Sequence, residues 1–239
     1  MKKPKEHDIY LSIVSICGEN DLDKLEEFLK FLPKDKRIEI IVMKNKIVSG
    51  QIIRDFKPVL LNEIENFKLY EMQVNDLDFG YLRNQAKSVA RGEWILSIDI
   101  DEYIPNIYHK DILEVLSKQK QDVEGLRVGI VSDLVDYLNE EMYVSYLSRP
   151  TRIFRNNKNN NWLGSIHEMI CQQYPEKVLD SNIKLIHFGY EISNEEMKLK
   201  YLRNIRLIAR EIYFQTDVNL LEYYRDYMYK SLVTLENIK

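Results

Sequence analysis

Short apolar runs alternate with helical patterns through the first hundred residues, and this alternation constrains the fold more than any other feature. Largely apolar runs of strand length occupy residues 9–16 (IYLSIVSI), 38–43 (IEIIVM), 69–74 (LYEMQV) and 94–98 (WILSI). Between them, residues 21–32 and 79–91 place apolar side chains at helical spacing. Strands that alternate with helices in this way predict right-handed βαβ units. We therefore expect an α/β fold with a mainly parallel, twisted sheet.

The second half of the chain has a different pattern. We expect a helix over about residues 108–120, strands at 126–131, 142–147, 151–154 and 183–187, and a polar surface turn (NNKNNN) at 156–161. From residue 194 the pattern is helical to the end, with two packed helices at 201–214 and 220–235. The chain is thus expected to comprise an α/β domain over residues 1–190 and a C-terminal helical appendage over 191–239.

The composition excludes several classes of protein. The 239 residues carry a net charge of -4, and acids and bases are interspersed, which argues against a protein that coats nucleic acid or membranes. The two cysteines, Cys17 and Cys171, lie far apart and have no C-x-x-C spacing, so neither a disulfide framework nor a thiolate zinc site is expected. With no segment of transmembrane length and no signal-peptide cleavage site near the start, we expect a cytoplasmic protein.

The run GEWILSIDIDEYIP places three carboxylates, Asp99, Asp101 and Glu102, directly after an apolar strand. Carboxylates this close repel one another unless a cation or basic partners offset the charge. Open α/β sheets bind ligands at the carboxyl ends of their strands, which predicts a Mg²⁺ or Mn²⁺ site that bridges to substrate phosphates. The alternative is that one carboxylate caps the next helix. Two other Asp-x-Asp pairs, at residues 21–23 and 76–78, adjoin helices and have structural explanations.

Four motifs together resemble those of the family 2 glycosyltransferases of GT-A fold, particularly the cell-wall-biogenesis branch. They are FGYLRNQAKSVARGEWILSIDIDEYIP, RPTRIFRN, GSIHEMI and LIHFGY, in that order and at roughly the spacing of the family, and the resemblance covers about residues 8–190. The resemblance implies a Rossmann-like GT-A glycosyltransferase domain with an inverting, metal-dependent mechanism. Such an enzyme moves a hexose-type sugar from a nucleoside-diphosphate donor to an acceptor hydroxyl.

The resemblance also implies roles for residues on the donor side. Asp99 would contact the ribose or sugar of the donor, and Asp101 would ligate the Mn²⁺ or Mg²⁺ on the diphosphate. Arg83 could grip phosphate through its planar guanidinium, with a solvated helix arginine as the alternative. His187 of LIHFGY would complete the metal shell, or else be a core histidine. Among the three arginines of RPTRIFRN, we expect Arg152 to reach the pyrophosphate.

The motif GSIHEMI resembles the acceptor-side motif of the family. An inverting transferase needs a base beside the acceptor hydroxyl, on the face opposite the leaving group. Glu168 is the residue that we expect in this role, and His167 is the alternative base. A third interpretation is an edge-strand His-Glu pair that faces water.

The chain departs from the family after the second strand. Many members carry an acidic residue there that binds the nucleotide base, whereas this chain has Lys-Asn-Lys at residues 44–46. Asp55, Glu19 or backbone groups near Ser15 and Cys17 are candidate substitutes. The identity of the base therefore stays open at the level of sequence.

Two other functions compete with the glycosyltransferase hypothesis. The altered segment at 44–46 favours a degenerate GT-A domain that only binds a nucleotide sugar or a protein. A nucleotidyltransferase ranks last, because CGENDLDK after the first strand is acidic where that class has a Gly-rich or basic loop. The helices after residue 194 would hold an acceptor or a second subunit, or simply complete the fold. The acceptor (glycan, lipid-linked sugar, peptide or modified nucleic-acid base), the donor sugar and the oligomeric state stay open.

Overall fold

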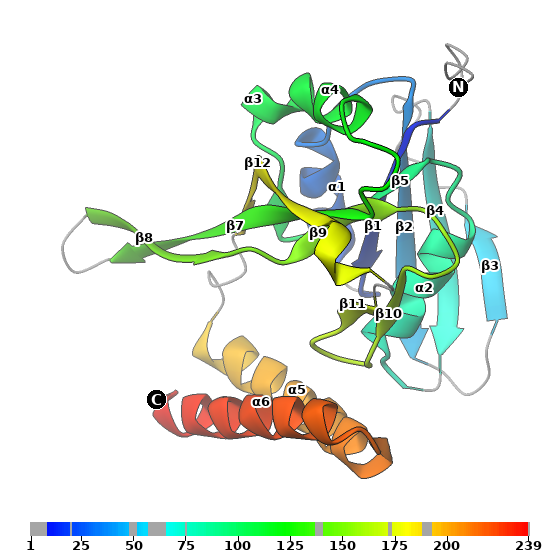
Figure 1. The fold of residues 1–239 in the computed structure, drawn as a ribbon. Coiled ribbons are helices and arrows are strands. Elements are labelled where there is room, and N and C mark those ends of the chain that lie inside the picture. Colours follow the sequence, from blue (N-terminus) through cyan, green and yellow to red (C-terminus); the bar gives the residue numbers. More distant parts are fainter. Residues whose placement is uncertain are drawn as a thin grey trace.

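The computed structural model describes residues 9–19, 21–47, 52–56, 66–74, 76–136, 141–171, 174–187 and 193–238 (Figure 1). The strands are β1 (Leu11–Cys17), β2 (Ile38–Ile47), β3 (Ile52–Phe56), β4 (Phe67–Val74), β5 (Trp94–Ser97), β6 (Glu102–Tyr103), β7 (Gly125–Asp136), β8 (Glu141–Ser148), β9 (Thr151–Arg155), β10 (Asn161–Leu163), β11 (Met169–Cys171) and β12 (Val178–His187). The helices are α1 (Leu22–Lys30), α2 (Phe79–Ser88), α3 (Asn106–His109), α4 (Asp111–Ser117), α5 (Asn194–Phe214) and α6 (Val218–Asn237), with a 3₁₀ turn at Pro175–Lys177.

One large sheet organises the molecule. Its strand order is β3-β4-β2-β1-β5-β9-β7-β12-β6, with β8 paired to β7, while β10 and β11 form a separate antiparallel pair. The pairings make β4, β2, β1, β5, β7 and β12 run in one direction and β3, β9, β8 and β6 in the other. The fold is α/β with a mainly parallel sheet, which confirms the prediction. Of these four antiparallel strands, β3 and β6 come from the first half of the chain and β8 and β9 from the second half.

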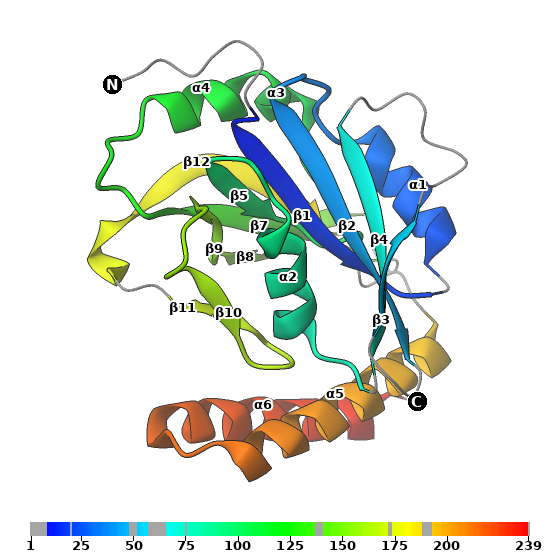
Figure 2. The same cartoon turned by 90° about the vertical axis from the view of Figure 1, so that its right-hand side faces the viewer.

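Helices cover both faces of the sheet, and each face has its own core. Side chains of α1 and α4 pack on one face together with Leu11 and Ile13 of β1. Side chains of α2, α5 and α6 pack on the other face together with Val14 of β1. The whole of β1 is buried, as expected for a parallel strand covered on both sides. Figures 1 and 2 show α5 and α6 side by side, below α2 and the β10–β11 pair.

Several predicted elements differ in extent from those observed. The helix expected over 108–120 is divided into α3 and α4. The strand expected at 183–187 begins earlier, at Val178. The sequence missed β3 entirely, because this edge strand mixes apolar and charged residues (IIRDF) and so lacks a continuous apolar run.

Local contacts explain how α2 and α5 begin. The Asp78 side chain caps α2 by accepting a hydrogen bond of 2.8 Å from the Tyr81 backbone N–H, which confirms its predicted structural role. A capping box formed by Ser193 and Glu196 begins α5. Asp76 binds Arg206 across the fold, at 2.7 Å. Of the described helices, none is both long and apolar enough to cross a membrane.

Candidate active site

A cavity of about 880 Å³ opens beyond the carboxyl ends of β1 and β5, where the α/β fold predicts a ligand site. Cys17 and Gly18 line it at the end of β1, and Asp99 and Asp101 line it after β5. Its volume lies within the range of about 300–1,000 Å³ that is usual for small-molecule sites. Seven of the residues that the sequence predicts for the site line this one cavity: Arg83, Asp99, Asp101, Arg152, His167, Glu168 and His187.

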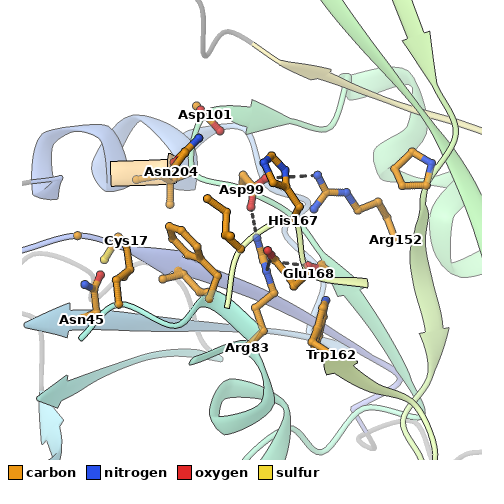
Figure 3. A pocket seen from close by; sticks show the side chains of 18 of the residues that line it. Cys17, Asn45, Arg83, Asp99, Asp101, Arg152, Trp162, His167, Glu168 and Asn204 are labelled. Atoms are coloured by element: carbon orange, nitrogen blue, oxygen red, sulfur yellow. Dashed lines mark hydrogen bonds and ion pairs between the residues drawn. The ribbon is translucent and has the colours of Figure 1, made fainter. Parts of the chain in front are cut away.

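Arg83 of α2 lies at the centre of the site and joins its two sides. Its Nε donates to Oε1 of Glu168 at 2.5 Å, its Nη1 donates to Oγ of Ser97 at 2.9 Å, and its Nη2 donates to Oδ1 of Asp99. Figure 3 shows the side chain extended between the two carboxylates. Because all three nitrogens already donate to side chains, the geometry favours a positioning role over a free grip on phosphate. Arg83 is only 5% exposed, so the solvated-arginine alternative is wrong.

Arg152 of β9 makes the second cationic contact with Asp99. Its Nη2 lies 3.3 Å from Oδ2 of Asp99 and 2.8 Å from Oε1 of Glu102. The other oxygen of Glu102, Oε2, accepts the backbone N–H of Asp99 at 2.9 Å. Glu102 therefore braces the turn that carries Asp99. The Arg152 Nε is buried and has no hydrogen-bond partner among the described residues.

Burial and the neighbouring arginines act in opposite directions on the pKa values of Asp99 and Glu102. Burial alone would raise the pKa of Asp99, but the guanidinium groups of Arg83 and Arg152 outweigh it and hold this pKa well below its usual range. Glu102 is more completely buried, and burial raises its pKa to about 7 even though Arg152 opposes the shift. Asp99 is thus fixed in its charged form at neutral pH.

Asp101 and His187 form the candidate metal position. In the pairing of β6 with β12, His187 lies opposite Glu102. Because Glu102 directly follows Asp101 in the chain, this pairing brings His187 close to Asp101. His187 Nε2 lies 3.3 Å from Oδ2 of Asp101. Burial would lower the pKa of His187, but its hydrogen bond to Asp101 raises it overall. Among the described residues no group of three or more His, Cys, Asp or Glu side chains could hold a metal ion.

A pair of protein ligands suits a metal that is shared with a substrate. Mg²⁺ and Mn²⁺ are commonly bound through one or two side chains, with water and phosphate oxygens in the remaining positions. The carboxylate of Asp101 and the imidazole of His187 fit such a site. Asp99 fits it less well, because both of its oxygens are engaged by arginines.

The two candidate bases face different surroundings. The Glu168 side chain is 13% exposed and points to Arg83 inside the cavity. The His167 ring stacks on Tyr227 with a centroid separation of 3.8 Å, and burial lowers its pKa to about 4. The His167 Nε2 is buried and unpartnered within the described parts of the chain. Both residues line the cavity, so the interpretation as an edge-strand pair facing water is wrong.

At the β1 end of the cavity, the lining residues differ from those expected. Ser15 is buried in β1 and does not line the cavity, whereas Ile16, Cys17 and Asn45 do. Glu19 forms an ion pair of 2.8 Å with Lys46 and is engaged there. The side chain of Asp55, another predicted substitute, lies outside the described residues. Asn45 is therefore a polar side chain that lines the cavity at that end, together with Asp21, which accepts the backbone N–H of Gly18 at 2.9 Å.

Helices α1, α5 and α6 also contribute to the cavity; the sequence offered an acceptor-binding role for the C-terminal helices as one alternative, but it did not indicate the charged residues that line the cavity. Lys24 of α1, Lys200, Arg203 and Asn204 of α5, and Tyr223 of α6 all line it. In the sequence these residues look like ordinary helix-surface positions, and only the tertiary packing places them around the cavity. A cluster of cations at the mouth of an acidic site is suited to an anionic substrate.

No protein-family model matches this chain. The glycosyltransferase SunS of the SPbeta prophage in Bacillus subtilis (strain 168) is 32% identical over 141 residues, which cover 58% of this chain and 31% of that protein. The predicted resemblance to glycosyltransferases is confirmed. SunS of Bacillus phage SPbeta matches equally, and in both cases the matched stretch is about a third of the relative's length.

Solved structures give weaker matches. Staphylococcus aureus TarS (residues 1–349) in complex with UDP-GlcNAc superposes with a TM-score of 0.48 at 16% identity, over 94% of this chain and 72% of that one. The complex of the same TarS fragment with UDP gives a TM-score of 0.46 at 18% identity, over 93% and 70% of the two chains.

Proposed function

We propose that this chain is a glycosyltransferase domain that transfers a hexose-type sugar, with inversion, from a nucleoside-diphosphate donor to an acceptor hydroxyl. The observation that carries the proposal is the convergence of three separated motifs on one cavity. Asp99 and Asp101, Glu168, and His187 come from distant parts of the sequence and meet there. Sequence similarity to SunS supports the same class of reaction.

The charges of the cavity support a donor that carries a diphosphate. Lys24, Lys200 and Arg203 line the cavity together with Asp99 and Asp101. Cations at this position would neutralise phosphate oxygens, and fixed carboxylates would accept hydrogen bonds from sugar or ribose hydroxyls. Asn45 would contact the nucleotide base at the β1 end of the cavity. We leave the identity of that base open.

Glu168 is the proposed catalytic base. Its carboxylate would take the proton from the acceptor hydroxyl as that oxygen attacks the anomeric carbon of the donor. The bond from this carbon to the diphosphate oxygen breaks on the opposite face, and the nucleoside diphosphate leaves with the electron pair. Arg83 holds Glu168 and Asp99 at once and so fixes the distance between the base and the donor carboxylate.

Asp101 and His187 would hold Mn²⁺ or Mg²⁺. A bound divalent cation would stabilise the negative charge that develops on the leaving diphosphate. Metal dependence is part of the proposal and has its own test, the replacement of His187 and Asp101 by Ala together. This double variant should lose affinity for manganese. Unchanged affinity would refute the assignment of Asp101 and His187 as metal ligands.

The main experiment measures release of nucleoside diphosphate from a panel of nucleotide sugars, with water or glycerol as the acceptor. Replacing Glu168 by Gln should slow release by about a hundredfold or more, since general bases contribute roughly 10²–10⁴. Donor affinity should stay within about threefold, because the base contacts the acceptor. Glu222→Gln, at an exposed position of α6, is the matched control. Near-normal turnover by Glu168→Gln would refute the assignment of the base.

The competing function, a degenerate binding module, predicts a different result. In that case the wild-type chain would bind a nucleotide sugar and release no nucleoside diphosphate from it. The altered segment at 44–46 motivates this alternative, because it has no acidic residue for the nucleotide base and its lysines, Lys44 and Lys46, form ion pairs with Glu71 and Glu19.

A further inference from the structure

The C-terminal helices contact the loop that carries the proposed base. This base loop, residues 164–168, connects β10 to β11. We propose that Glu211 of α5 and Tyr223 of α6 are positioning residues that hold the base loop and thereby aim Glu168 into the cavity. The inference rests on the proposed function and assigns α5 and α6 to the active site rather than to an appendage.

One side of the base loop lies against the start of α2. The backbone N–H of Phe79 donates to the carbonyl oxygen of Ser165 at 2.9 Å. A Cβ atom added at Gly80 would lie 2.3 Å from the carbonyl oxygen of Gly164, so the two backbones meet without room for a side chain. The loop is thus fixed on the sheet side by backbone contacts.

The other side of the base loop is held by α5 and α6. Oε1 of Glu211 accepts the backbone N–H of Ser165 at 2.7 Å. The Tyr223 hydroxyl donates to the carbonyl oxygen of His167 at 3.2 Å, and the Tyr227 ring stacks on the His167 ring. The contact of Glu211 is near the start of the base loop, and the contacts of Tyr223 and Tyr227 are at His167, the residue before Glu168.

The helix that supplies Glu211 is itself firmly attached. Leu207 and Ile208 of α5 are fully buried in the core of the second face. Arg210 binds Asp76 at 2.9 Å and the carbonyl oxygen of Leu77 at 3.0 Å, just before α2. The Glu211 carboxylate therefore extends from a rigid support to the base loop.

The backbone of His167 shows why the loop needs support. Its φ is +50°, in the left-handed region that non-glycine residues rarely adopt. Such conformations persist where the surroundings over-determine them. Relaxation of His167 would redirect the next residue, Glu168, away from Arg83. A displacement of about 1 Å at a catalytic group can slow a reaction by about a hundredfold.

The experiment compares Glu211→Ala, Glu211→Gln and Tyr223→Phe with the wild-type chain. Glu222→Ala and Tyr229→Phe, both at exposed positions of α6, are the controls. The first readout is amide hydrogen exchange of the peptide that contains the base loop. Loss of the Glu211 acceptor should accelerate exchange at Ser165 by about tenfold, whereas Gln, which can still accept the N–H, should restore most of the protection.

The second readout is the release of nucleoside diphosphate from the donor. Glu211→Ala and Tyr223→Phe should each lower kcat by about tenfold, equivalent to about 1.4 kcal/mol, with the donor KM unchanged. If Glu211 and Tyr223 only stabilised the fold, the variants would have a lower melting temperature but would not combine a lower kcat with an unchanged donor KM. Equal exchange and equal kcat in Glu211→Ala and the wild type would overturn the proposal.

The two readouts separate this inference from the proposed function. If the wild type released no nucleoside diphosphate from any donor, the proposed function would fail, and with it the catalytic part of the inference. The exchange measurement would still decide whether Glu211 and Tyr223 hold the base loop.

Discussion

Replacement of Arg83 by Met should destabilise the fold, because it leaves two carboxylates without their shared cation. The side chain is 5% exposed and binds Glu168, Ser97 and Asp99. Methionine has a similar length and no charge, so the cavity left behind is small. The expected loss therefore comes from unpaired charge rather than from packing.

The magnitude follows from the exposure of the partners. Removing one member of a buried ion pair costs roughly 3–5 kcal/mol. The Asp99 side chain is 35% exposed and water can solvate it, whereas that of Glu168 is only 13% exposed. We therefore expect the lower end of the range, about 3 kcal/mol. For a chain of this size that loss lowers the melting temperature by about 6–12 °C.

The difference in stability between the wild type and Arg83→Met should depend on pH. Asp99 has a lowered pKa in the fold, so its stabilisation by Arg83 is complete above the unfolded pKa of about 3.9 and is lost as the pH falls further. The gap between wild type and Arg83→Met should therefore be largest near pH 7 and narrow towards pH 3.

Urea unfolding at several pH values measures this gap. Arg83→Lys, which keeps the charge without the planar guanidinium, should lose an intermediate amount. Arg225→Met, at an exposed position of α6, is the control and should stay within about 0.5 kcal/mol of the wild type. A loss below 1 kcal/mol for Arg83→Met, or a gap that does not change with pH, would refute the reasoning.

Two further predictions concern the base loop. Gly164 has a φ of +92°, and a Cβ added there would lie 2.1 Å from the Tyr224 hydroxyl, so Gly164→Ala should cost about 2 kcal/mol or more; an unchanged melting temperature would contradict this. Burial lowers the pKa of His167 to about 4, so the fold holds it neutral and loses stability as the pH falls below the unfolded pKa of about 6.5. Between pH 7 and pH 5 this loss is up to about 2 kcal/mol, and His167→Gln should remove it in urea unfolding; an equal loss in the variant would show that other groups cause it.

Much of the fold could be predicted because its signals are local. The buried strand β1 is a largely apolar run, and α2 follows a capping aspartate, Asp78, that the sequence already indicates. The edge strand β3 could not be predicted in this way, because a strand that pairs on one side only need not be a continuous apolar run. The pairing of β12 with β6 could not be predicted either, since it joins segments about 80 residues apart and depends on the whole sheet.

In the candidate site, too, the features with local signals could be predicted and those that depend on long-range contacts could not. Asp99 and Asp101 follow a strand, so their place at the ligand-binding edge could be predicted from the alternating pattern alone. The two ion pairs by which Arg83 joins Asp99 to Glu168 could not be predicted, because helix arginines with and without buried partners look alike in sequence. For the same reason Glu211 gave no signal, although it binds the base loop.

The most direct test of the central claim is a calorimetric titration of the purified chain with nucleoside-diphosphate sugars that differ in base and sugar, with and without Mn²⁺. The wild type should bind at least one donor in a metal-dependent manner, and a variant that combines Asp99→Asn with Asp101→Asn should lose this binding while remaining folded. Absence of binding by the wild type, or equal binding by the double variant, would contradict a donor site at these carboxylates.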